Sequence, residues 1–218
     1  MIVALCNTKG GVGKTTAAIN IAVAFALAGR KVLLIDGDRQ ATTAMAMGIR
    51  ESEQCAPPVP CLTCPDGDGD FLLHHAKANK GRYHDIVIDA GGRDSAALRA
   101  ALLAAQVVLV PFQPRSFDVW ALNDVAALVS AANKNRQGRP LRALAFLNCA
   151  DIGGPDNADA AACVAEAPPL VYLNAPLSRR KAFANAAGSG RCVHELRPKD
   201  NKASAELSAL VDALKAHR

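Results

Sequence analysis

The feature that most constrains the fold of this chain is a glycine-rich segment at residues 9–16, KGGVGKTT, which lies between two apolar runs. Residues 2–6 read as a short buried strand, and residues 14–28 read as a buried helix with no breaker before Gly29. Glycines between a strand and a helix let the backbone turn its N–H groups inward, and the helix N-terminus adds positive potential. The segment therefore predicts a loop that binds phosphate groups.

Two side chains of this loop have chemistry suited to a nucleoside triphosphate. Lys14 is expected to reach the β- and γ-phosphates, and the Thr15 hydroxyl is expected to hold Mg²⁺. The strict pattern G-x-x-x-x-G-K-[ST] is not met, because Thr8 stands five residues before Gly13, where that pattern requires glycine. The chain has instead a second lysine, Lys9, at the start of the loop.

Strand-like and helix-like runs alternate along the whole 218-residue chain. The strand-like runs are continuously apolar, as expected for strands that are covered on both faces. This pattern predicts an α/β fold, a doubly wound and mostly parallel sheet with helices on both faces, in a single domain over residues 1–218. Strands are expected at 2–6, 31–35, 84–88, 107–110, 144–148 and 170–173, and helices at 14–28, 40–48, 71–79, 94–105, 117–133, 156–165, 179–187 and 202–216.

Residues 50–70 differ in character from the rest, with several prolines, three cysteines and the run DGDGD. Long loops in compact domains are often functional or mobile, so a mobile loop within the domain is expected here. Cys61 and Cys64 have the C-x-x-C spacing of a metal knuckle, with Cys55 and two histidines nearby. A structural zinc site usually needs two matched pairs, so free thiols are the favoured interpretation and a metal site is the alternative.

The net charge of +5 is unevenly distributed, because residues 179–218 carry nine Lys/Arg against four Asp/Glu while the preceding residues balance. Such an excess is either a footprint for nucleic acid or anionic lipid, or an ordinary solvated surface. No apolar run approaches the roughly 18–20 residues of a membrane span. Apolar residues follow Met1 directly, without the basic region of a signal peptide. A cytoplasmic location is the default expectation.

The loop KGGVGKTT resembles the deviant phosphate loop of the ParA/MinD family of P-loop ATPases, which the nitrogenase iron protein group shares. Residues 36–40, DGDRQ, resemble the family's D-x-D-x-Q switch I. Residues 86–92, IVIDAGG, resemble its switch II, although the last two glycines stand where members often have prolines. Residues 180–183 and 190–195 are similar to its C-terminal pattern. The chain most resembles the short ParA proteins without an N-terminal helix-turn-helix, because the loop begins within ten residues of Met1.

This resemblance implies roles for individual residues. Lys9 would reach across a dimer interface to the triphosphate of the other subunit, Asp38 would orient the attacking water near the metal, and Asp89 would hold the Mg²⁺ hydration shell. Asn148, at the end of a predicted strand, is a candidate for adenine recognition. The catalytic set is then Lys9, Lys14 and Asp38, and the metal set is Thr15, Asp38 and Asp89. The nucleotide-binding set is Lys9, Gly10, Gly11, Val12, Gly13, Lys14, Thr15, Thr16 and Asn148.

The function that the resemblance implies is an ATP-hydrolysing partition switch with ATP and Mg²⁺ as cofactors. ATP would drive homodimerisation, the dimer would bind DNA of the nucleoid without sequence preference, and a small DNA-binding partner protein would stimulate slow hydrolysis. The alternatives are a membrane-associated positioning ATPase of MinD type and a metabolic or conjugation-related ATPase of the same fold. The last predicted helix is short and mixed in charge, which favours packing on the sheet over membrane targeting.

Overall fold

The computed structural model describes residues 1–136, 138–154 and 156–217, without the side chains of residues 117–119. Its described strands are β1 (Ile2–Asn7), β2 (Val32–Asp36), β3 (Cys61–Thr63), β4 (Asp85–Gly92), β5 (Val107–Phe112), β6 (Arg142–Ala150), β7 (Leu170–Tyr172) and β8 (Leu177–Ser178). The described helices are α1 (Lys14–Leu27), α2 (Thr42–Ser52), α3 (Gly69–Ala78), α4 (Ala96–Ala104), α5 (Ser116–Asn135), α6 (Asp156–Ala162), α7 (Lys181–Gly188) and α8 (Asn201–Lys215). Short 3₁₀ turns are η1 (Pro65–Gly67), η2 (Cys163–Glu166) and η3 (Val193–Glu195).

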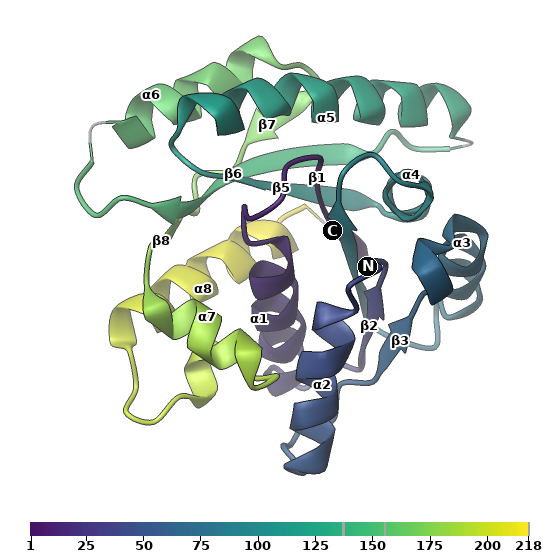
Figure 1. Cartoon of the computed structure of the whole chain (residues 1–218), viewed down its shortest axis with the longest axis vertical. Helices are drawn as coiled ribbons and strands as arrows, with labels where there is room; N and C mark the ends of the chain where they lie inside the picture. Colours follow the sequence, from purple (N-terminus) through teal and green to yellow (C-terminus); the bar gives the residue numbers. More distant parts are fainter. Residues whose placement is uncertain (137, 155, 218) are drawn as a thin grey trace.

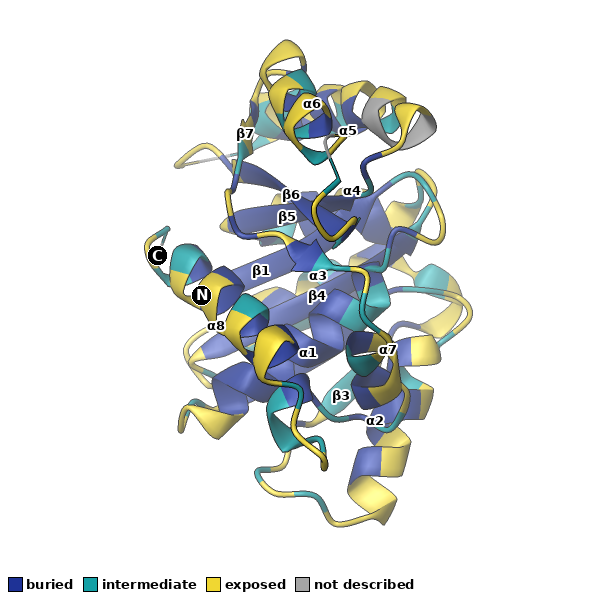
Figure 2. Ribbon diagram, turned by 90° about the vertical axis from the view of Figure 1, so that its left-hand side faces the viewer, coloured by how far each residue is buried: buried dark blue, intermediate teal, exposed yellow. Residues whose placement is uncertain are grey.

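The strands form one parallel sheet in the order β3-β2-β4-β1-β5-β6-β7, with β8 paired to β6. Helices α3, α4, α5 and α6 cover one face, and α1, α2, α7 and α8 cover the other (Figure 1). Residues of β1 alternate between the two cores, and the strands at the centre of the sheet are buried throughout (Figure 2). The doubly wound, parallel α/β fold predicted from the sequence is confirmed.

The order of the strands brings three sequence motifs to one edge of the sheet. β1 lies between β4 and β5, and β2 lies on the other side of β4. Because these strands are parallel, the loops that follow them all leave at the carboxyl edge, where open α/β sheets bind their ligands. Asp36 of β2 pairs in register with Asp89 of β4, and Leu5 of β1 pairs with Asp89 from the other side. The phosphate loop and both predicted switches therefore meet.

Two element predictions are wrong in extent. Residues 50–70 are not one loop, since they hold the end of α2, the strand β3, the turn η1 and the start of α3. The three residues of β3 are too few to signal a strand locally, and they form one only by pairing with β2. Helix α2 also continues through Gly48, where the sequence suggested an end. That glycine has open space around it. The mobility of the segment stays a prediction.

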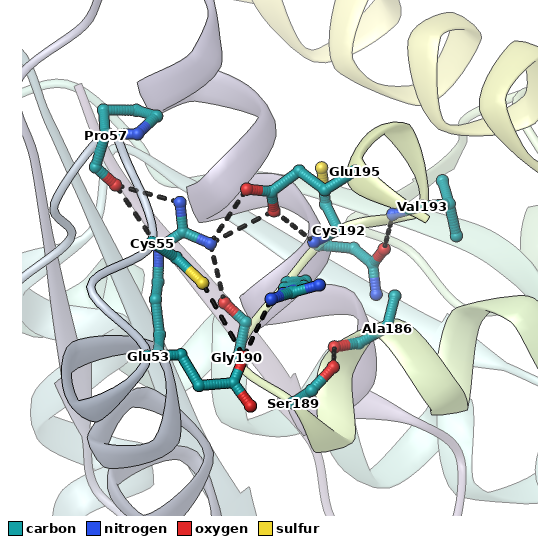
Figure 3. Close-up of polar contacts among 12 residues, drawn as sticks. Glu53, Cys55, Pro57, Ala186, Ser189, Gly190, Cys192, Val193 and Glu195 are labelled. Atoms are coloured by element: carbon teal, nitrogen blue, oxygen red, sulfur yellow. Dashed lines mark hydrogen bonds and ion pairs between the residues drawn. The ribbon is translucent and has the colours of Figure 1, made fainter. Parts of the chain in front are cut away.

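Helix α2 is tied to the C-terminal segment by Arg50, whose side chain is only 2% exposed. Its Nη1 donates to the Gly190 carbonyl at 3.0 Å and to both carboxylate oxygens of Glu195 at 3.1 Å, and its Nη2 donates to the Pro57 carbonyl at 2.9 Å. Figure 3 labels its partners Pro57, Gly190 and Glu195, which lie between α2 and the segment that contains Cys192. A buried ion pair is tolerated only when its remaining donors and acceptors are satisfied in this way.

Candidate functional site

The loop between β1 and α1 has a backbone that only glycine accommodates easily. Gly11 and Gly13 have φ angles of 76° and 86°, in the left-handed region that favours glycine. A Cβ atom on Gly13 would also lie 2.2 Å from the Asn148 amide nitrogen. Among the described residues, the backbone N–H groups of Gly10, Gly11 and Gly13 donate no hydrogen bond. A run of unpaired N–H groups at a helix N-terminus is suited to hold an anion.

Side chains from three strand ends hold this loop in place. The Asn148 amide, at the end of β6, donates to the Val12 carbonyl at 2.7 Å. The Gln113 amide, after β5, donates to the Gly11 carbonyl at 3.0 Å. Asn7, the last residue of β1, accepts from the Lys9 N–H at 2.9 Å. Two of these contacts take loop carbonyls and the third takes the Lys9 N–H, so the glycine N–H groups remain for a ligand.

The Lys14 side chain lies within this loop. It is 6% exposed, and its Nζ donates to the Lys9 carbonyl at 2.8 Å. A Cβ on Gly92 of switch II would lie 3.4 Å from the same Nζ, so that glycine lets the strand end pass close to the lysine. Burial lowers the pKa of Lys14, while the nearby Asp89 opposes that shift. A buried ammonium that lacks a contact ion pair among the described residues gains stability when an anion binds beside it.

Asp89 lies fully buried on β4 next to the loop. Its Oδ2 accepts from the Thr15 hydroxyl at 2.6 Å and from the Thr43 hydroxyl at 2.7 Å. Its Oδ1 is buried without a hydrogen-bond partner in the described part of the chain. Burial raises the pKa of Asp89, and both hydroxyls oppose that shift. An unsatisfied buried carboxylate oxygen is costly, so the site is suited to a cation or an ordered water.

The donors at this site fit Mg²⁺. Thr15 and Asp89 supply hydroxyl and carboxylate oxygens, the hard ligands that Mg²⁺ prefers. Within the described ranges, no group of three or more His, Cys, Asp or Glu is arranged to hold a metal ion. A magnesium ion here therefore needs phosphate and water oxygens to complete its coordination, as is usual at phosphate-binding sites.

Cys61 and Cys64 pack against opposite faces of the sheet, which separates the two thiols of the C-x-x-C motif.

The predicted switch I lies against the predicted switch II. Asp36 is buried, and its carboxylate accepts from the N–H groups of Asp38 at 3.0 Å and Ala44 at 2.8 Å. Burial raises the pKa of Asp36 to about 6. A Cβ on Gly91 would come within 3.3 Å of the Asp38 side chain, so the glycine of switch II allows this close approach. Asp38 thus lies beside the same strand end that carries Asp89.

The structure brings together the loop, Asp38, Asp89 and Asn148, which the sequence placed far apart. Asn148 is buried and braces the loop, and its role in adenine recognition stays a prediction. Sequence reasoning missed Thr43, which shares the Asp89 carboxylate with Thr15. The only local signal for it was a threonine in the first turn of a helix after the D-x-D motif. Sequence reasoning also missed Gln113, because no motif in the neighbouring residues indicates that its side chain contacts the phosphate loop.

Three arginines of the C-terminal segment are paired with acids. Arg179 lies 3.7 Å from the Asp151 carboxylate, and Arg180 lies 2.9 Å from that of Glu206. Arg191 lies 2.8 Å from the carboxylate of Glu53. Arg218 falls outside the described residues. The positive excess of residues 179–218 is therefore partly neutralised by neighbours.

No described helix has both the length and the apolar character that crossing a membrane requires.

A profile of the CobQ/CobB/MinD/ParA nucleotide binding domain matches residues 3–215, and the chain therefore belongs to this family. Among curated proteins, it is 32% identical over 160 residues to the chromosome-partitioning ATPase Soj of Thermus thermophilus, covering 62% of this chain and 63% of that protein. It is 33% identical over 129 residues to the maintenance of carboxysome distribution protein A of Gloeobacter kilaueensis, covering 56% and 53%. The chain thus spans less than two thirds of the length of these relatives.

Solved structures of the same fold cover nearly the whole chain. An ATP complex of Cyanothece McdA aligns with a TM-score of 0.81 at 16% identity, over 98% of this chain and 96% of that one. The cell division ATPase MinD of Pyrococcus furiosus aligns with a TM-score of 0.76 at 22% identity, over 100% and 99%. At these identities the likeness shows the fold, which is that of the MinD/ParA proteins.

Proposed function

We propose that this chain is an ATP-hydrolysing partition switch that uses Mg²⁺. Three features that lie together at one sheet edge carry the proposal. They are the unpaired N–H groups of the loop, the buried Lys14 side chain, and the Thr15–Asp89 pair, in which one carboxylate oxygen of Asp89 is unsatisfied. A triphosphate satisfies the first two features, and Mg²⁺ satisfies the third. The curated relatives named as partitioning proteins support the choice of partition among the functions of this family.

Hydrolysis of ATP needs charge neutralisation and a positioned water more than covalent chemistry. The loop amides and Lys14 would bind the phosphates, and Thr15 with Asp89 would hold the metal, which supplies charge neutralisation when bound. Asp38, which lies against Gly91, would orient the attacking water. Thr43 fixes the orientation of the Asp89 carboxylate through its hydroxyl, so we add it to the residues that position the metal.

Lys9 would act in trans. It lies half-buried at the start of the loop, before Gly10 and Gly11, where added Cβ atoms would meet nothing within 4 Å. This open surface allows a second copy to approach the loop closely, so that each Lys9 neutralises charge on the other copy's triphosphate. The γ-phosphate would then stabilise the dimer, and dimerisation would tighten ATP binding by the same factor.

The ATP dimer would bind DNA of the nucleoid without sequence preference, and a small DNA-binding protein would stimulate hydrolysis in the cytoplasm. Arg179, Lys181 and Arg191 of the basic C-terminal segment would contact the DNA phosphates, and the ion pairs of the two arginines would have to open for this. The MinD-type alternative is less favoured, because Leu207, Leu210 and Leu214 of α8 are fully buried against the sheet. That helix offers no free apolar face to a membrane.

Sedimentation with a non-hydrolysable ATP analogue tests the proposal. Wild type should dimerise with the analogue and then co-sediment with DNA but not with anionic liposomes. Lys9→Ala should bind nucleotide as a monomer without dimerising or hydrolysing ATP, and Lys14→Ala should lose nucleotide binding. A Lys9→Ala protein that dimerises and turns over normally would exclude the role in trans. Liposome binding in place of DNA binding would favour the membrane-associated alternative.

A further inference from the structure

A second cationic cavity lies at the edge of the sheet opposite the phosphate loop. It has a volume of about 290 Å³, and its lining includes Met1, Gln106, Arg136, Arg139 and Arg142. These residues precede or begin β1, β5 and β6, or follow α5. Because the strands are parallel, their amino ends lie at the edge away from the loop. The cavity is therefore separate from the candidate nucleotide site.

The lining of this cavity has an unbalanced positive charge. Three arginines line it, and none of the described lining residues is Asp or Glu. Within the described residues, none of the three forms an ion pair with a carboxylate. This differs from Arg179, Arg180 and Arg191 of the C-terminal segment, which are all paired with acids. The described chain thus supplies no compensating anion to the cavity arginines.

Local hydrogen bonds orient some of the cavity arginines and leave other guanidinium N–H groups without an acceptor in the described part of the chain. Arg136 Nη1 donates to the Leu102 and Leu103 carbonyls at the end of α4, at 2.7 and 2.9 Å, which orients the guanidinium. Its Nε has no hydrogen-bond partner among the described residues, but it is buried away from solvent, so the donors left for a ligand are those of the other guanidinium nitrogens. Arg142 Nη1 donates to the His217 carbonyl, and Arg139 is exposed. Unused guanidinium donors around one cavity are matched to the planar, bidentate bonding that phosphate oxygens accept.

We propose that this cavity is a second phosphate-binding site, which takes the phosphate or diphosphate group of an anionic ligand through Arg136, Arg139 and Arg142. The group can come from the backbone of a nucleic acid or from a small phosphorylated molecule, since both present the same oxygens. The site does not depend on the proposed ATPase activity, because none of its lining residues belongs to the phosphate loop or the switches.

Backbone amide NMR of the full chain, titrated with inorganic pyrophosphate, tests this site. Amides of Gly138, Arg139, Leu141 and Arg142 report on the cavity and those of residues 10–16 report on the phosphate loop, so the two proposals succeed or fail separately. We expect saturable shifts at the cavity amides. Arg139→Gln combined with Arg142→Gln should weaken that binding by about tenfold or more, the scale of a lost charge-assisted hydrogen bond. Arg82→Gln is the matched control, since Arg82 is also exposed and lies outside the cavity.

A short DNA duplex distinguishes the two sources of phosphate. If the duplex shifts the same amides and competes with pyrophosphate, the ligand is a nucleic acid. If only pyrophosphate shifts them, the ligand is a small phosphorylated molecule. Pyrophosphate shifts confined to residues 10–16, or equal affinity in wild type and the double variant, would overturn the proposal. Arg139→Gln alone, at an exposed side chain, gives the same comparison if the double variant does not fold.

Discussion

Replacing Arg50 by leucine should destabilise the fold strongly, because it leaves several acceptors without donors at once. Glu195 has a side chain only 16% exposed, and after the change its one remaining donor among the described residues would be the Cys192 N–H at 3.0 Å. The carbonyls of Gly190 and Pro57 would lose a charged donor each. Removing one member of a buried ion pair costs about 3–5 kcal/mol. For a chain of this length we therefore expect the melting temperature to fall by roughly 6–20 °C.

Equilibrium urea unfolding followed by circular dichroism measures this cost directly. The matched control is Arg99→Leu, which breaks the pair with Asp94 at a site where the arginine side chain is 60% exposed. Exposed pairs contribute little, so this variant should unfold close to wild type. An Arg50→Leu protein whose unfolding free energy falls by less than about 1 kcal/mol would refute the reasoning, because such a loss is ordinary for a single substitution. The C-terminal segment would then be held by its apolar contacts alone.

Three further predictions follow from the site and its surroundings. Gly13→Ala should abolish nucleotide binding in a fluorescent-nucleotide titration, because its Cβ would lie 2.2 Å from the Asn148 amide and its φ is 86°. Gly10→Ala, whose Cβ meets nothing within 4 Å, should bind nearly as wild type. Asp38→Ala should still bind ATP and dimerise but lose turnover in a phosphate-release assay, and a wild-type rate would remove its role in positioning water. Burial lowers the pKa of His194, so the unfolded chain takes up its proton first as the pH falls through about 6.5. Asp36, whose pKa is raised to about 6, contributes the opposite trend, but it does so equally in a His194→Gln protein. The unfolding free energy of wild type relative to His194→Gln should therefore fall from pH 7 to pH 5 in urea unfolding, and parallel profiles for the two proteins would exclude this role of His194.

Local sequence was sufficient for the features that depend on neighbouring residues. The glycines and lysines of residues 9–16, placed between an apolar strand and an apolar helix, predict a phosphate-binding loop. The continuously apolar strand runs predict a parallel sheet with both faces covered. Both features arise from chain segments shorter than about twenty residues, within which backbone freedom and side-chain periodicity act.

Tertiary structure decided which distant residues meet. The strand β3 forms because β2 offers its edge, and the apolar signal of three residues is too short to show this. Thr43 and Thr15 share one Asp89 oxygen only because α2 and α1 both begin beside the end of β4.

Arg50 and Glu195 illustrate the same limit, since 145 positions separate them and neither carries a local signal for burial. The lining of the second cavity likewise combines Met1 and Gln106, which precede β1 and β5, with the arginines that precede or begin β6. Periodicity and composition describe what a segment can become on its own. Which polar groups are brought together at an edge or between helices depends on strand order and packing, which are set by contacts across the whole chain.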